Sequence, residues 1–182
     1  MAMATIADFL GNYCTCIPDG ETGESGYWNK WEEYTFENCE DLKFEVIMQT
    51  TLGFNYTIKR RLYKIKDGVI PSSLDLGELG YADEAIKSYK TFKILKNKKI
   101  INAKVRFQVG IPSAMALVVG FIVTSDQRKV EPAVVKAIKR ELKKLQSSIP
   151  PEELLFNLTY VRRLSAMIRE LTYLMMIYSM GR

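Results

Sequence analysis

The chain has 182 residues and a formal net charge of +5, and 47% of its residues are hydrophobic against 26% charged. This balance excludes a disordered or fibrous protein, and a chain of this length buries about 70% of the surface that its unfolded form exposes. We therefore expect one folded domain over residues 1–182.

Charge is distributed unevenly along the chain. The first 45 residues contain ten acidic residues and two lysines, a net charge of −8, so the remainder carries +13. Such asymmetry can indicate a nucleic-acid partner, whose binding would depend strongly on salt. Most of the basic residues, however, fall on the outer faces of two predicted amphipathic helices, where a solvated surface explains them. We therefore expect no nucleic-acid partner.

Cysteine and histidine counts limit the chemistry available. Three cysteines, Cys14, Cys16 and Cys39, are too few for a disulfide framework, and no secretory signal precedes them, so we expect a cytoplasmic protein. Because the chain has no histidine and no second cysteine pair, we expect no metal site and no cofactor. The apolar runs Val109–Val123 and Leu171–Met180 are shorter than the about 20 residues of a membrane helix, so we expect no membrane partner.

The first predicted element is a short strand over Tyr13–Ile17, which Pro18 and Gly20 end. The loop that follows, within Cys16–Trp31, contains three acidic residues, three glycines and two tryptophans. A solvated turn rarely needs two tryptophans, so this loop is a candidate binding segment. The two cysteines of the strand are two residues apart, and we expect both thiols on the side that carries small apolar groups.

Apolar periodicity predicts the later elements. The segment Leu42–Tyr63 is β-branched and aromatic but interrupted by Gly53, so its structure stays open. Helices then follow strands, with short connections between them, an order typical of βα units around a parallel sheet. In chain order we predict a helix over Ala82–Lys98, a strand over Val105–Ile111, a helix from Pro132 to Gln146, a strand over Leu154–Val161 and a helix over Leu164–Met180.

Alternation along the predicted strands separates apolar from polar side chains. In a (βα)8 barrel, one side of each strand meets the helices, and the other side lines the interior and carries polar groups near the carboxyl end. Arg106 and Gln108 fit the interior side of one strand, and Asn157 and Thr159 fit that of the next.

Five blocks of the sequence, in this order, resemble a known family: "IPDGETGE", "ELGYADEAIKSYKTFKIL", "VRFQVGIPSAMA", "VEPAVVKAIKRELKKL" and "IPPEELLFNLTYV". Together they are similar to the uroporphyrinogen decarboxylase and cobalamin-independent methionine synthase-like superfamily, in its N-terminal half only. The resemblance implies an α/β fold, a partial (βα)8 TIM-barrel-like structure of about four βα units with a parallel sheet. It also implies a pocket at the carboxyl ends of the strands.

The resemblance suggests how this pocket would bind a ligand. Carboxylates of the loop would accept hydrogen bonds from a polar molecule, and its glycines would let the backbone approach closely. Two structural explanations also stay open. The tryptophans could instead anchor the following helix, and Arg106 could serve only to neutralise Asp19 or Glu21. The candidate ligand-binding residues are Asp19, Gly20, Glu21, Trp28, Arg106, Gln108 and Asn157, and no catalytic residue is assigned.

Two departures from the family bear on function. A full barrel has about 250 residues, and the family has eight units, so we expect this chain to supply one half. Where relatives read "QWDVAVE", residues 157–163 lack both acidic side chains. We therefore expect a domain that binds a polar small molecule or another protein, such as a second copy or a full-length relative, without catalysis of its own. The alternative is a methyltransferase-like or decarboxylase-like enzyme, active only when an oligomer or a partner completes the barrel.

Overall fold

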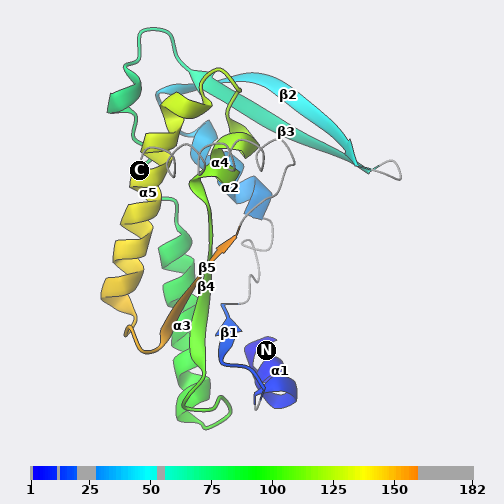
Figure 1. Ribbon diagram of the computed structural model, residues 1–182, viewed down its shortest axis with the longest axis vertical. Helices are drawn as coiled ribbons and strands as arrows, with labels where there is room; N and C mark the ends of the chain where they lie inside the picture. The colour runs from blue at the N-terminus through cyan, green and yellow to red at the C-terminus, as the bar shows by residue number, and fades with distance from the viewer. Residues whose placement is uncertain (1, 12, 20–27, 53–55, 160–182) are drawn as a thin grey trace, which may run out of the picture.

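The computed structural model describes residues 2–11, 13–19, 28–52 and 56–159, and its centre is a three-stranded parallel sheet in the order β1-β4-β5 (Figure 1). Helices pack beside this sheet, and a separate antiparallel pair of strands, β2 and β3, extends away from it. The chain is therefore α/β, and its described residues form no closed barrel. The elements are α1 Ala2–Leu10, β1 Cys16–Pro18, α2 Trp28–Glu37, β2 Leu42–Leu52, β3 Tyr56–Ile65, the 3-10 turn η2 Pro71–Ser73, α3 Tyr81–Asn97, β4 Arg106–Pro112, α4 Ala114–Phe121, α5 Gln127–Ser148 and β5 Leu154–Thr159.

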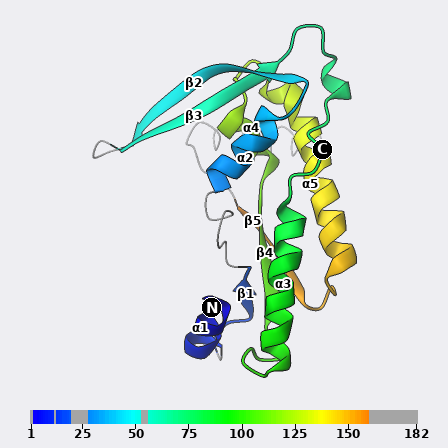
Figure 2. The same cartoon turned by 180° about the vertical axis from the view of Figure 1, so that it is seen from behind.

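One face of the parallel sheet is packed against α3. Phe107 of β4 is fully buried, and the ring centroids of Tyr89 and Phe92 of α3 lie 5.5 and 5.3 Å from its own. Apolar residues spaced three and four apart along α3 form this contact, as in any amphipathic helix on a sheet. Helix α5 lies beside α3 in both views (Figures 1 and 2). The core therefore lies between the sheet and these helices.

The start of α3 is capped by a side chain from α5. Gly80, the N-cap residue, has a φ of +83° and offers no side chain of its own. The buried carboxylate of Glu141 instead accepts hydrogen bonds from the backbone N–H groups of Leu79, Gly80 and Ala82, at 2.7, 3.2 and 2.7 Å. These donors have no partner within the helix, and a negative charge there also favours the helix dipole. Glu141 thus joins the two long helices.

The segment Leu42–Tyr63, left open by the sequence, belongs to an antiparallel hairpin. Figures 1 and 2 show it extending away from the rest of the molecule. Its base is attached to the core: Tyr63 stacks on Phe36 at 6.4 Å, and Asp126 accepts a hydrogen bond from the backbone of Ile65 at 3.1 Å. The hairpin occupies the part of the chain between β1 and β4, and its two strands form a separate antiparallel sheet. The described residues therefore contain three parallel strands, whereas we expected about four βα units.

Helix α5 begins five residues before the predicted start. We expected Pro132 to open the helix, but it lies inside it. The backbone carbonyl of Asp126 accepts hydrogen bonds from the N–H groups of Lys129 and Val130, so the first turn forms at Gln127. Pro132 costs this helix one hydrogen bond, because it has no N–H to donate.

Helix α4 was not predicted. Its sequence is apolar on all sides, and such a run shows no helical period. Ser113 nevertheless caps it, since its Oγ accepts a hydrogen bond from the N–H of Ala116 at 3.2 Å. The predicted helix over Leu164–Met180 lies outside the described residues.

A half-buried ionic cluster joins α3 to the amino ends of β4 and β5. Glu153 accepts hydrogen bonds from the Lys96 ammonium at 3.0 Å and from the Tyr89 hydroxyl, and Lys96 also donates to the carbonyl of Val105. Burial raises the pKa of Glu153, but the bonds from Tyr89 and Lys96 outweigh it and lower the pKa below the usual 4.5. The ionised carboxylate is therefore the form that stabilises this end of the sheet.

A pH dependence follows from this lowered pKa. Because the folded-state pKa lies below the unfolded one, the contribution of Glu153 is fully present above pH 4.5 and is lost as the pH falls through the folded-state value. We expect Glu153→Gln to reduce the free energy of unfolding by about 1–2 kcal/mol at pH 6 and by much less at pH 3. Urea unfolding from pH 3 to 7 measures this difference, and a constant difference across that range would contradict it. The exposed Glu152→Gln is the control.

Candidate ligand-binding face of the parallel sheet

The face of the sheet that points away from Phe107 carries polar side chains. Residues alternate between faces along a strand, and paired residues of parallel strands share a face. The register pairs Cys16 with Arg106, and Gly110 with Asn157. We call this the polar face, and its polar members with described side chains are Cys16, Arg106, Gln108 and Asn157.

The structure brings together Cys16, Gln108 and Asp19. The Cys16 thiol donates to the side-chain Oε1 of Gln108 at 3.0 Å, and the backbone N–H of Asp19 donates to the Gln108 carbonyl at 2.9 Å. From α3, the Ser88 hydroxyl donates to the backbone carbonyl of Asp19 at 2.5 Å. These bonds fix the point where β1 ends and the acidic loop begins. Cys16 therefore has a polar neighbour, where we expected small apolar groups.

Arg106 lies at the other end of the sheet. It is the first residue of β4 and pairs with Cys16, three residues before Asp19, which is a distance of about 10 Å along the strand. The described residues contain no ion pair between Arg106 and Asp19, and the other alternative partner of Arg106, Glu21, lies outside them. Arg106 is exposed.

Asn157 is an exposed member of the same face. It pairs with Gly110, two residues beyond Gln108, and is therefore a diagonal neighbour of Gln108 nearer the carboxyl ends of the strands. Of the remaining predicted site residues, Gly20 and Glu21 lie outside the described residues. Trp28 opens α2, but its side chain also lies outside them.

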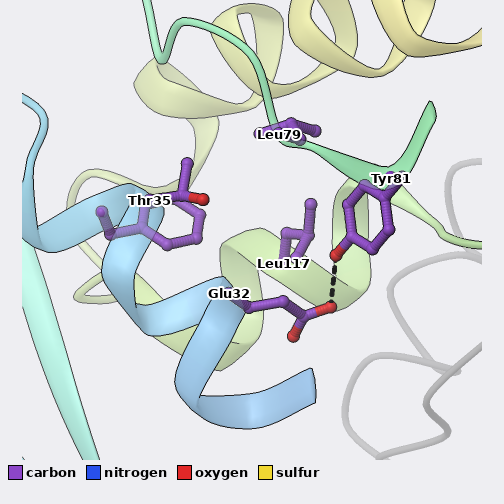
Figure 3. Close-up of a pocket in the computed structure, with 6 residues that line it drawn as sticks. Glu32, Thr35, Leu79, Tyr81 and Leu117 are labelled. Carbon is purple, nitrogen blue, oxygen red and sulfur yellow. Dashed lines mark hydrogen bonds between the residues drawn. The ribbon is translucent and has the colours of Figure 1, made fainter. Parts of the chain in front are cut away.

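A second polar feature, which no sequence pattern predicts, lies beyond the carboxyl end of β1. The Tyr81 hydroxyl donates to Oε1 of Glu32 at 2.7 Å, and Glu32 is 7% exposed (Figure 3). Tyr81 precedes Ser88 by seven residues, so it lies about 10 Å further along α3 than the contact with Asp19. Glu32 and Tyr81 line a small depression with Thr35, Phe36, Leu79 and Leu117.

The region beyond the carboxyl ends of parallel strands is a common position for binding sites. Ligands of α/β proteins bind beyond the carboxyl ends of the strands, where loops meet helix starts. Asp19, Glu32 and Tyr81 lie in this region, and the polar face leads toward it from Gln108. Glu32 could not be predicted, because its partner is 49 residues away in sequence.

The described residues contain no group of three or more histidine, cysteine, aspartate or glutamate side chains that could hold a metal ion. None of the helices in the described part of the chain is long and apolar enough to cross a membrane. No family model matches the sequence, and no curated protein or solved structure matches it. The polar face and the region beyond its carboxyl end are therefore the candidate functional site.

Proposed function

We propose that this chain is a portion of a (βα)8-type barrel, similar to the methionine synthase-like superfamily, that binds a polar small molecule and does not catalyse a reaction by itself. One observation carries the proposal. The parallel sheet has one face buried under α3 and an opposite face with Cys16, Arg106, Gln108 and Asn157 half-buried or exposed. This is the division between the outside and the inside of a barrel wall.

The strand order agrees with a barrel section. Strands β1, β4 and β5 are neighbours in the order in which they occur in the chain, as barrel strands are. One half of a doubly wound sheet has the same order, and the reversal at its switch point does not occur among these three strands. Further strands from a second copy, a full-length relative or another polypeptide would continue the sheet from β1 or β5 and enclose the polar face.

The chemistry of the polar face favours binding. Its polar side chains are a thiol, a guanidinium and two amides; the amides both donate and accept hydrogen bonds, and the guanidinium only donates. Arg106 adds a fixed positive charge, which favours an anionic ligand. Asp19 and Glu32 lie beyond the strand ends, where a completed barrel would place its reacting groups. Catalysis in such an assembly is the alternative proposal.

Ligand binding tests the proposal directly. We expect a thiol-containing amino acid or a polycarboxylic acid from a small panel to raise the melting temperature of the protein, and Gln108→Ala to weaken its affinity at least tenfold. Titration calorimetry measures the affinity, and Gln146→Ala on the exposed side of α5 is the matched control. Equal binding by the Gln108 variant and the native chain would place the ligand elsewhere.

The same panel separates the two proposals. A wild-type chain that binds no member of the panel at millimolar concentration would contradict a binding role for the polar face. Release of carbon dioxide, or methylation of the thiol compound when a methyl donor is supplied, would favour the enzymatic alternative.

A further inference from the structure

The outer edge of β2 is unusual for an exposed strand. In the described part of the chain no strand other than β3 pairs with β2, so its other edge is not part of a larger sheet. The stretch "VIMQTTL", Val46–Leu52, contains no charged residue, no proline and no glycine. Natural proteins usually protect such edges with charges, prolines or short strands, and uncharged β-forming stretches of six or seven residues readily pair with other strands.

Exposed apolar side chains accompany this edge. Phe44, Val46 and Ile47 are 52%, 47% and 50% exposed. Beyond its base, which lies against α2 and α4, the hairpin of β2 and β3 extends away from the helices and the parallel sheet in both views (Figures 1 and 2). A hairpin of two strands is marginally stable in water on its own, and added strands stabilise it.

The opposite edge of the hairpin is less suited to pairing. Strand β3 carries four basic residues, Lys59, Arg60, Arg61 and Lys64, and like charges placed opposite each other destabilise a strand pair. Near its base, the carbonyl of Tyr63 already accepts a hydrogen bond from the backbone of Val123 at 3.0 Å. The edge that remains for a partner is that of β2.

We infer that β2 pairs antiparallel with β2 of a second copy of this chain, across a two-fold axis, to form a four-stranded sheet. A two-fold axis perpendicular to the sheet places two identical edges antiparallel, so no second, complementary surface is needed. The charged residues of β2, Lys43 and Glu45, lie at its base. When the pairing is centred on the uncharged stretch, Lys43 and Glu45 of one copy lie opposite residues near the tip of the other copy's hairpin. No like charges then meet across the interface.

Sedimentation tests this interface. We expect the wild-type chain to sediment as a dimer at micromolar concentration, and Ile47→Lys with Gln49→Lys to weaken the dimer at least tenfold, because the two substituted residues at position 49 then face each other and those at position 47 lie diagonally beside them. Ile94→Lys on α3, where the isoleucine is 54% exposed, is the matched control and should leave the dimer intact. A wild-type monomer at 100 micromolar, or equal effects of both variants, would overturn the inference.

Hydrogen exchange distinguishes this dimer from one formed through the parallel sheet. The amides of Val46–Leu52 should become more protected as the protein concentration rises, while those of β1 and β5 should not change. Protection gained in β1 or β5 alone would show that copies associate by extending the barrel wall and would overturn the β2 interface. The proposed ligand-binding role does not depend on either result.

Discussion

Replacing Glu141 with alanine should reduce the free energy of unfolding by about 3–5 kcal/mol, because three backbone donors lose their acceptor and each buried unsatisfied group costs roughly 1–3 kcal/mol. The backbone N–H groups of Leu79, Gly80 and Ala82 would lose their acceptor, and Glu141 is only 2% exposed, so water cannot readily replace it. The Lys144–Asp83 ion pair, at 2.8 Å, also joins α5 to the first turn of α3, but it is more exposed than the Glu141 carboxylate, which is the described link from α5 to the backbone at the start of α3. Its loss should therefore loosen both helices.

Urea unfolding followed by circular dichroism measures this effect. Glu141→Gln keeps one carbonyl oxygen and the shape of the side chain, so we expect a smaller loss of about 1–3 kcal/mol. Glu152→Ala, at an exposed position, should change stability by no more than about 0.5 kcal/mol. A loss below 1 kcal/mol for Glu141→Ala would show that α3 does not depend on this cap.

Replacing Phe107 with alanine should cost about 3–5 kcal/mol, the usual range for a buried phenylalanine. The ring is fully buried, touches the rings of Tyr89 and Phe92, and lies on the central strand between Ile17 and Leu154 of its neighbours. The substitution removes apolar contact area and leaves a cavity between the sheet and α3. It should therefore destabilise the sheet as a whole.

Phe107→Ala should lower the stability of the fold without changing its affinity for the proposed ligand. Residues 106 and 108 point to the opposite face, so folded molecules of the variant should bind the proposed ligand with unchanged affinity. Phe107→Leu should cost no more than about 1.5 kcal/mol because it fills most of the space. Phe9→Ala, at a side chain that is 75% exposed, is the control and should have almost no effect. Equal losses for Phe9 and Phe107 would contradict the packing described.

The sequence by itself determined the elements whose evidence is local. The apolar stripe of α3 predicted a helix over 82–98, and the structure has it over 81–97. The alternation in β4 predicted a strand over 105–111, one residue from the observed 106–112, and also which side chains share a face. Amphipathic periods extend over a few turns or residues, so no distant partner is needed to recognise them.

The tertiary structure alone decided which distant residues meet. Glu141 caps a helix that begins 60 residues earlier, and Glu32 bonds to Tyr81, 49 residues away. Strand register placed Arg106 three residues short of Asp19, although both belong to the same predicted site. The hairpin of β2 and β3 likewise depends on pairing between two segments that are ambiguous when taken singly. Such contacts depend on strand register and on how helices pack, and these determine which side chains lie next to each other. Local sequence does not specify either of them.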